Sequence, residues 1–329
     1  MTQDVRHVPR ARLHIVSGKG GTGKTTVASA LALALASEGK KVLLCEVEGR
    51  QGIASIFDVA PLPYAERRIA VGDGGGEVDA LAIDPEAALL EYLQMFYRLG
   101  RAGRALDKFG VIDFATTVAP GVRDVLLTGK VYEAAGRKEH GRSVYDAVVL
   151  DAPPTGRIGR FLAVNSEVAG IAKVGPIRQQ ARSIMALLTS SQTRVHLVTT
   201  LEEMPVQETL DAAAELSSLG LPFGAVVVNL LQAPELEPDA LAQAAAGNLD
   251  EARVEASLKE AGIKAEPTVV TSLLELGRQH AERVELETEQ RNRLLHVGSG
   301  VVTLPNLTDG VDLGGLYELA ADLRASAEF

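Results

Sequence analysis

The sequence predicts an α/β fold in which a mostly parallel sheet is covered by helices on both faces. Short apolar runs alternate with helical patterns along most of the chain, an order typical of strands joined by helical crossovers. A glycine-rich loop connects the first apolar run to an alanine- and leucine-rich helix. Between residues 84 and 140 the strand pattern disappears and a helical pattern replaces it. We therefore expect a single domain over residues 1–329 with an inserted helical subdomain at 84–140.

The individual strands follow from apolar runs of the length expected for strands that are buried on both faces. The first run, residues 13–16, precedes the glycine-rich loop and a helix expected over residues 27–36. The later runs lie at residues 42–47, 78–83, 147–150, 195–199, 225–228 and 301–304. An amphipathic pattern over residues 313–323 predicts a closing helix.

The inserted subdomain starts with a well-marked helix. Asp84 suits the N-cap and Pro85 the first helical position. Over residues 89–99 the apolar face is wide, and the polar stripe is formed by three residues, Glu91, Gln94 and Arg98. Such a helix is either buried within the subdomain or offered to a hydrophobic partner, and the sequence leaves both possibilities open. A second apolar helical stretch, residues 166–190, could join the subdomain as an opposing wall.

Composition and charge argue against several classes of function. The formal net charge of −10 disfavours a general nucleic-acid binder, and no apolar run approaches the roughly 18 residues of a membrane helix. Cys45 is the only cysteine, so one chain can form neither an internal disulfide nor a cysteine-based zinc or iron–sulfur site. The N-terminal residues do not resemble a signal peptide. We expect a cytoplasmic protein that binds no nucleic acid and contacts membranes only through a partner.

The glycine-rich loop fits the phosphate-binding pattern G-x-x-x-x-G-K-[ST], placed between a strand and a helix. Its backbone N–H groups and the following helix N-terminus would surround the phosphates of ATP. The expected nucleotide-binding residues are Gly18, Lys19, Gly20, Gly21, Thr22, Gly23, Lys24, Thr25 and Thr26. Lys24 should reach the β- and γ-phosphates as a catalytic residue, Thr25 should coordinate Mg²⁺, and Thr26 should bind the α-phosphate.

Lys19 is a second lysine within this loop, at a position where a standard phosphate loop needs no cation. With it, the segment GKGGTGKTT resembles the loop of the deviant Walker A ATPases, which include partition, septum-placement, nitrogenase iron-protein and arsenical-pump members. The resemblance implies that Lys19 is catalytic across a dimer interface, because in that class this lysine reaches the partner's phosphates. The chain has one such loop, so a second ATPase subunit is expected, either an identical chain or a paralogue.

The strand at 147–150 leads into Asp151 and a Pro-Pro turn, which reads as a Walker B carboxylate followed by a switch. Asp151 is expected to hold a water on Mg²⁺. The segment resembles the D-T-A-P-T-G-H switch of the arsenical-pump ATPases and of relatives that deliver tail-anchored membrane proteins. Three positions differ from that pattern, Ala152, Pro153 and Arg157.

The strand at 42–47 leads to two carboxylates, Glu46 and Glu48, which strand geometry would place on one side. In the resembling families this segment is switch I, with aspartate at the position of Glu48 to orient the attacking water. The extra methylene of Glu48 shifts the carboxylate by about 1.5 Å, which favours slow hydrolysis. Two solvated acids at a strand end are the alternative.

Three residues late in the chain are expected near the adenine base because the arsenical-pump family has similar ones there. They are Asn229, Pro305 and Leu307. The stretch at residues 201–209, which includes Glu208, also looks like that family.

These patterns together predict a P-loop ATPase of the deviant Walker A class that uses ATP and Mg²⁺ as a nucleotide-driven dimeric switch. It resembles the arsenical-pump and tail-anchored-targeting branch, in particular single-cassette "anion-transporting ATPase" proteins of actinobacterial type. Protein or membrane-protein targeting is favoured over arsenite extrusion, because the arsenite site of the pump relatives uses clustered thiols. A hydrophobic client helix is therefore an expected partner. A nucleotide-binding scaffold with little hydrolysis and a DNA-partition-type ATPase are the alternatives.

Overall fold

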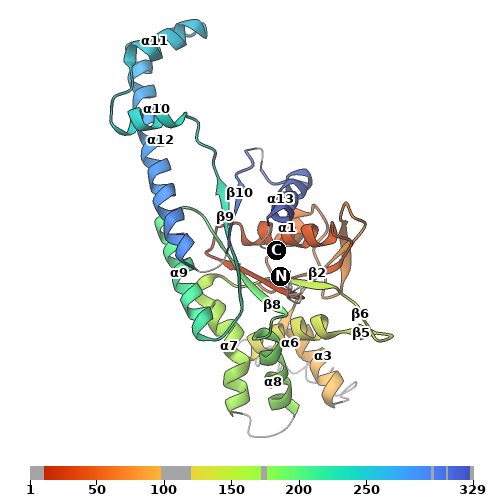
Figure 1. The fold of residues 1–329 in the computed structure, drawn as a ribbon. Helices are drawn as coiled ribbons and strands as arrows, with labels where there is room; N and C mark the ends of the chain where they lie inside the picture. Colours follow the sequence, from red (N-terminus) through yellow and green to blue (C-terminus); the bar gives the residue numbers. More distant parts are fainter. Residues whose placement is uncertain (1–10, 98–119, 172–175, 298–299, 309, 327–329) are drawn as a thin grey trace, which may run out of the picture.

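The structure is a computed structural model that describes residues 11–97, 120–171, 176–297, 300–308 and 310–326. Its centre is an eight-stranded sheet with the order β10-β9-β8-β1-β7-β2-β4-β3 (Figure 1). All neighbouring strands are parallel except β3, which pairs antiparallel with β4 at one edge. The strands are β1 (Leu13–Gly18), β2 (Lys41–Glu46), β3 (Arg67–Val71), β4 (Glu77–Ala82), β7 (Ala147–Asp151), β8 (Thr193–Thr199), β9 (Phe223–Leu231) and β10 (Val301–Pro305). The predicted fold class is confirmed.

Helices cover both faces of the sheet because successive strand residues point to opposite sides. Val16 and Leu44 pack on the face covered by α1 (Lys24–Ala36) and α13 (Leu313–Ala325). Their neighbours Ile15 and Leu43 pack on the other face. That second face is covered by α6 (Pro120–Gly136), α7 (Thr155–Ile171), α8 (Pro176–Leu188) and α9 (Glu203–Ser218). Each central strand is therefore buried on both sides, which explains its continuous apolar run.

The helical insert begins where the sequence predicts it. Helix α3 (Pro85–Tyr97) starts directly after Asp84, whose Oδ1 accepts a hydrogen bond from the backbone N–H of Ala87 at 2.8 Å. Arg98 and the rest of the predicted helix lie outside the described residues. The predicted helical stretch at 166–190 contains the end of α7 and the helix α8, and residues 172–175 between them lie outside the described residues. Both pack against α6, and α3 packs against α6 as well.

A two-stranded hairpin follows α6, formed by β5 (Lys138–Glu139) and β6 (Arg142–Ser143). The first strand of the hairpin lies within the predicted insert, 84–140, where no strand was expected, and the second lies beyond it. The described part of residues 84–137 is helical where it is regular.

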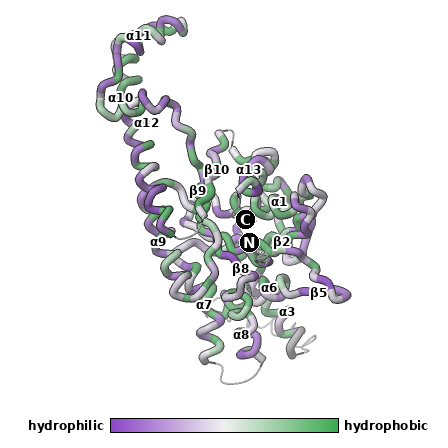
Figure 2. Tube along the Cα trace, in the orientation of Figure 1, coloured by the Kyte–Doolittle hydropathy of each residue, from purple (hydrophilic) through white to green (hydrophobic). Residues whose placement is uncertain are grey.

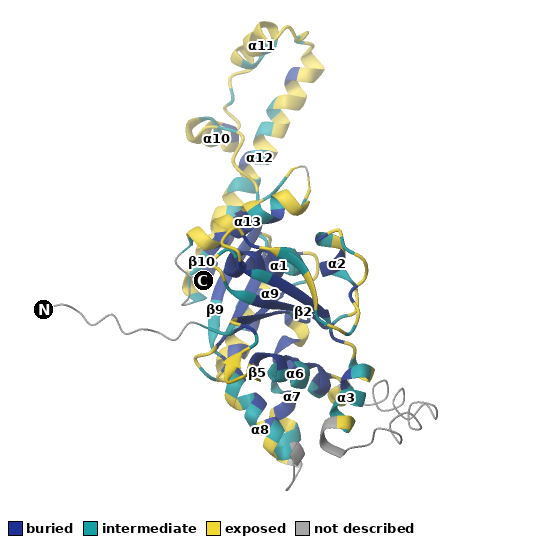
Figure 3. Cartoon of the chain, turned by 90° about the vertical axis from the view of Figure 1, so that its right-hand side faces the viewer, coloured by how far each residue is buried: buried dark blue, intermediate teal, exposed yellow. Residues whose placement is uncertain are grey.

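A helical arm follows β9 and projects from the side of the sheet where β9 and β10 lie (Figures 1 and 3). It consists of α10 (Pro238–Ala245), α11 (Glu251–Glu260) and α12 (Pro267–Leu294), and α12 continues into a short 3₁₀ turn, η1 (Leu295–Val297). With 28 residues, α12 is about 42 Å long. The arm is mostly exposed, and hydrophilic and hydrophobic residues alternate along it (Figure 2). Across the described ranges, no helix combines the length and the apolarity needed to cross a membrane.

Candidate functional site

The phosphate loop lies at the carboxyl end of β1, where the fold leaves room only for glycine at two positions. A Cβ on Gly18 would lie 2.3 Å from the carbonyl oxygen of Val198 on β8. Gly23 has a φ of 83°, and a Cβ there would lie 2.2 Å from Nδ2 of Asn229. The glycines of the motif therefore allow β8 and β9 to approach the loop closely.

Asn229 supports the loop from the end of β9. Its buried side chain donates a hydrogen bond from Nδ2 to the carbonyl oxygen of Thr22 at 3.0 Å. The hydroxyl of Thr22 in turn donates to the carbonyl oxygen of Lys19 at 2.9 Å. The contact to the adenine base remains a prediction, but the structure shows that Asn229 also fixes the backbone that would hold the phosphates.

Pro305 and Leu307, the other residues expected near the base, lie at the end of β10 beside β9. The N–H of Asn306 donates to the carbonyl oxygen of Leu231 at 2.9 Å, which ties this segment to the end of β9. The carboxyl ends of the parallel strands therefore carry the phosphate loop together with Asn229, Pro305 and Leu307.

Thr25 and Asp151, the predicted Mg²⁺ residues, are brought together by the sheet. Asp151 ends β7 beside Val16 of β1 and Glu46 of β2, and it accepts a hydrogen bond from the Thr25 hydroxyl at 2.6 Å. The pKa of Asp151 is raised to about 6, mainly by burial and to a smaller extent by the nearby carboxylates of Glu46 and Glu48. The Thr25 hydrogen bond and Lys24 act in the opposite direction.

The same carboxylate has an unsatisfied atom that fits a cation. Oδ1 of Asp151 is buried and has no hydrogen-bond partner among the described residues. A hydrated divalent cation would neutralise this carboxylate, and the free oxygen could hold one of the cation's waters. The Thr25 hydroxyl and such a water suit Mg²⁺, which usually takes its remaining ligands from water and phosphate. In the portions of the chain that the structure describes, no group of three or more acidic, histidine or cysteine side chains forms a metal cage.

Glu46 and Glu48 have different environments because β2 ends at Glu46. Glu46 is buried, and its two carboxylate oxygens accept the backbone N–H groups of Gln51 at 2.9 Å and Ile53 at 3.2 Å. It therefore fixes the start of α2 (Gly52–Ile56). Glu48 lies beyond the strand, with 21% of its side chain exposed and Arg50 3.8 Å away. Its water-orienting role remains a prediction.

Lys19 is held within its own chain. Its ammonium lies 3.1 Å from Oε1 of Glu208 on α9, and Oε2 of Glu208 accepts the hydroxyl of Thr155 at 3.0 Å. Thr155 is the first residue of α7, directly after the Pro153–Pro154 turn. The sequence pointed to Glu208 only as part of a similar stretch, and no local pattern indicated its contact with the phosphate loop.

Arg157, which departs from the resembling switch, connects that segment to the insert. Its guanidinium lies 3.7 Å from Asp124 of α6. Burial raises the pKa of Asp124, while Arg157, Arg123 and Arg160 lower it. Arg157, the third residue of α7, therefore connects the switch to the helical subdomain.

Residues 46–66, which we call the strap, run from the Mg²⁺ side of the site to the helical insert. Gln51 has a φ of 55°, and its side chain binds both backbone groups of Leu62, with Nε2 to the carbonyl oxygen at 3.1 Å and Oε1 to the N–H at 2.7 Å. Gln51 therefore closes the strap into a compact loop whose start is anchored by Glu46.

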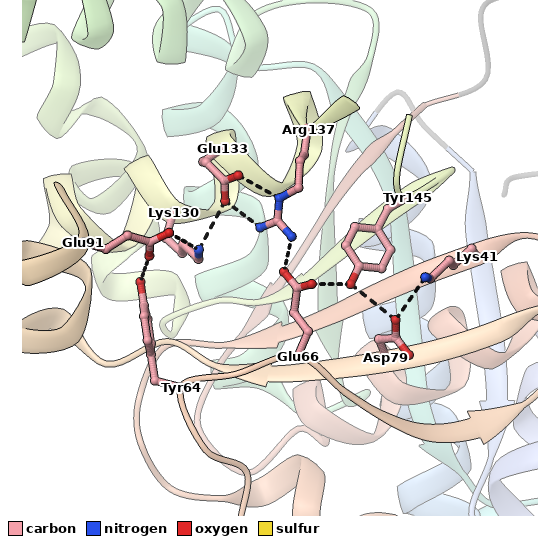
Figure 4. Close-up of polar contacts among 9 residues, drawn as sticks. All are labelled: Lys41, Tyr64, Glu66, Asp79, Glu91, Lys130, Glu133, Arg137 and Tyr145. Carbon is pink, nitrogen blue, oxygen red and sulfur yellow. Dashed lines mark hydrogen bonds and ion pairs between the residues drawn. The ribbon is translucent and has the colours of Figure 1, made fainter. Parts of the chain in front are cut away.

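The far end of the strap joins a polar network with α3 and α6 (Figure 4). The hydroxyl of Tyr64 donates to Glu91 of α3 at 2.5 Å, and Lys130 of α6 donates to the other oxygen of Glu91 at 2.8 Å. Arg137 of α6 donates to Glu66 at 2.7 Å. The network continues through Glu133, Tyr145, Asp79 and Lys41.

A cavity of about 370 Å³ lies among α3, α6, α7 and α8 beside this network. Its wall is mainly apolar and includes Leu89, Tyr92, Val122, Leu126, Val168 and Ile184. Tyr64, Glu91 and Lys130 of the network also line it. The wide apolar face predicted for α3 thus contributes to a cavity whose rim is connected to the strap.

Comparisons with known proteins agree with this geometry. A family model described as anion-transporting ATPase matches residues 11–190. The chain is 54% identical over 313 residues to the ATPase BagA of Mycobacterium tuberculosis, an alignment that covers 95% of this chain and 92% of the relative. It is 29% identical over 252 residues to an arsenical pump-driving ATPase of Acidiphilium multivorum, covering 69% of this chain and 41% of the relative. An arsenical pump-driving ATPase of Escherichia coli is 28% identical over 253 residues, with the same coverage of 69% and 41%.

Proposed function

Because the chain belongs to the anion-transporting ATPase family, we propose that it is an Mg²⁺-dependent ATPase that works as a nucleotide-driven dimeric switch. The observation that carries the proposal is the Thr25–Asp151 pair at the end of the phosphate loop, with Oδ1 of Asp151 buried and unpartnered. This arrangement is costly in a protein that binds no cation, since a buried carboxylate is destabilised by loss of solvation. A phosphate-bound Mg²⁺ removes that cost.

The residues of the loop divide the work of phosphoryl transfer among them. When bound, Mg²⁺ neutralises charge that develops on the phosphates, and Thr25 and Asp151 would hold it. Lys24 stabilises the transferring phosphate, and backbone N–H groups of residues 18–25 orient the triphosphate. Glu48 lies near Asp151, beyond the end of β2, where it can orient the attacking water. Hydrolysis then depends on positioning and charge rather than on a covalent intermediate.

In the proposed dimer, the Lys19 that faces the phosphates of one chain belongs to the partner chain. A partner is needed because the chain contains a single phosphate loop. The partner is an identical chain or a paralogue. Lys19 would complete each site only in the dimer, so that nucleotide binding and assembly favour each other.

The strap supports the coupling of this site to the helical insert. Glu46 anchors it beside Asp151, Gln51 fixes its middle, and Tyr64 contacts Glu91 at the cavity wall. A change in the turn at Glu48 on nucleotide binding would be passed through these contacts to α3 and α6. The cavity and the apolar face of α3 would then be presented to a hydrophobic client helix in one nucleotide state.

An arsenite-extruding role, suggested by the names of two relatives, has little support in this chain. Cys45 is the only cysteine, it is fully buried, and burial raises the pKa of its thiol. A soft anion site needs accessible clustered thiolates. We therefore propose that the switch acts in protein or membrane-protein targeting.

The ATPase assignment is tested by steady-state phosphate release with and without Mg²⁺. Lys24→Ala is expected to abolish ATP binding and turnover, because it removes the cation closest to the transferring phosphate. Lys264→Ala, which changes a side chain that is 87% exposed on the arm, is the matched control and should behave as wild type. Undiminished turnover in Lys24→Ala would contradict the assignment.

The coupling is tested by hydrogen exchange of α3 and α6 with and without Mg²⁺ and a non-hydrolysable ATP analogue. We expect a nucleotide-dependent change in the wild-type protein that Gln51→Ala loses while retaining nucleotide affinity. Gln243→Ala, at an exposed glutamine of α10, is the control. If α3 and α6 respond equally in Gln51→Ala, the strap does not carry the signal.

A further inference from the structure

Glu208 occupies a position between the two segments that a nucleotide would move. It lies in the second turn of α9, which is anchored to the core by the buried residues Pro205, Val206 and Thr209. One carboxylate oxygen contacts Lys19 of the phosphate loop at 3.1 Å, and the other accepts the Thr155 hydroxyl at 3.0 Å. A single carboxylate on a fixed helix therefore binds both the loop and the start of the switch helix.

These contacts point Lys19 toward its own subunit. The ion pair keeps the ammonium on α9, whereas the proposed dimer needs the same ammonium at the partner's phosphates. Lys19 cannot make both contacts with full charge pairing, so assembly must break the bond to Glu208. We propose that Glu208 is a positioning residue that retains Lys19 in the resting subunit and releases it on assembly; this inference rests on the proposed dimeric switch.

The Lys19–Glu208 ion pair is weak enough to form and break reversibly. The side chains of Lys19 and Glu208 are 31% and 35% exposed, so solvent screens their attraction. Ion pairs of this exposure change an equilibrium by up to about fivefold. An ion pair of that strength favours the resting position of Lys19, and binding of a nucleotide-bound partner can still break it.

Thr155 connects the Lys19–Glu208 ion pair to the nucleotide site. Three residues separate it from Asp151, and Ser17 near the end of β1 fixes the turn between them by donating a hydrogen bond to the carbonyl oxygen of Pro153 at 2.7 Å. Movement of this turn on nucleotide binding would withdraw the Thr155 hydroxyl from Glu208. The carboxylate then loses one of its two partners and holds Lys19 in a less defined position.

The first test is the reactivity of Lys19 in the nucleotide-free protein, measured by pulse acylation and mass spectrometry of the full chain. Glu208→Gln removes the charge but keeps an acceptor for Thr155, and it should raise acylation at Lys19 about fivefold relative to wild type. Glu203→Gln, the same change at an exposed residue of the same helix, should not. Equal labelling of Lys19 in wild type and Glu208→Gln would overturn the inference.

The second test is assembly, measured by sedimentation with Mg²⁺ and a non-hydrolysable ATP analogue, for the chain alone and mixed with its nearest paralogue. Glu208→Gln should tighten the dimer about fivefold and leave turnover at saturating protein unchanged, because the dimer no longer has to break the Lys19 pair. In a Lys19→Ala background the same change should have no effect. A weaker or unchanged dimer would overturn the inference.

Different results would exclude the dimeric switch and the role of Glu208. If wild-type protein does not assemble with the analogue in either mixture, the proposed dimeric switch is wrong and this inference falls with it. If wild type assembles and Glu208→Gln matches Glu203→Gln in Lys19 acylation and in assembly, the dimeric switch stands and the proposed role of Glu208 is wrong. Thr155→Val provides a second variant, since it removes only the hydroxyl and should raise Lys19 acylation in the same direction by a smaller factor.

Discussion

Replacing Asp151 with asparagine should stabilise the nucleotide-free protein while it removes function. Burial raises the pKa of Asp151 from 3.8 to about 6, so keeping it ionised in the folded state costs 1.36 kcal/mol for each pKa unit. At pH 7.5 the cost is about 3 kcal/mol, an upper limit that solvent near the site reduces. Asparagine carries no charge, and its side-chain oxygen can still accept the Thr25 hydroxyl.

The raised pKa of Asp151 determines how the stability difference between the variant and wild type changes with pH. The folded state binds the Asp151 proton more tightly than the unfolded state, so stability from this group is present below pH 3.8 and is lost as pH rises through 6. The advantage of Asp151→Asn over wild type should therefore fall by about 1.4 kcal/mol between pH 7.5 and pH 5.

Urea denaturation of the metal- and nucleotide-free proteins at the two pH values measures the difference, and other titrating groups cancel because both proteins share them. Adding Mg²⁺ and nucleotide should reverse the order, since only wild type offers the cation a carboxylate. An asparagine variant that is less stable than wild type at pH 7.5, or a difference independent of pH, would refute the reasoning.

Two further changes have defined outcomes. Glu48→Gln should slow ATP turnover while nucleotide affinity, measured by titration, stays nearly unchanged; unaltered turnover would place the water-orienting role elsewhere. The His14–His196 pair, with Nδ1 and Nε2 3.1 Å apart, should make the fold acid-sensitive because burial lowers the pKa of His14 from 6.5 to about 4. Stability from His14 is complete above pH 6.5 and falls by up to about 3 kcal/mol as pH decreases through 4. His14→Leu should flatten that loss in urea titrations, and an unchanged acid slope would exclude this cause.

The nucleotide side of the fold could be predicted from the sequence because its signals are local. Parallel strands buried on both faces appear as continuous apolar runs, and each end of the seven predicted strands lies within three residues of the observed end. The phosphate loop is a contiguous motif, and the meeting of Thr25 with Asp151 follows once β1 and β7 are neighbours.

The elements that were missed lack such signals. Strand β3 is a partly exposed edge strand that begins with two arginines, so it forms no apolar run. Helix α12 is mostly solvated and carries charge pairs such as Arg278–Glu275. Val269, Leu273 and Leu276 recur at helical spacing but are exposed, so the arm differs from the core helices in exposure and charge rather than in periodicity.

The contacts of the site that were missed are made by the fold rather than by any motif. Glu208 meets Lys19 only because α9 packs beside the phosphate loop. Gln51 binds Leu62 because Glu46 anchors a turn in which Gln51 takes a positive φ. The expectation that Glu46 and Glu48 share one side of a strand assumed that β2 continues past Glu46, but the strand ends there.

ATP turnover as a function of protein concentration tests the central claim, a composite site shared by two chains, most directly. We expect phosphate release per chain to rise with protein concentration and to saturate as sedimentation shows dimer formation, for the chain alone or with its paralogue. The Lys19→Ala variant should bind nucleotide but stay inactive at every concentration. Constant turnover per chain in a protein that sediments as a monomer, with Lys19→Ala as active as wild type, would contradict it.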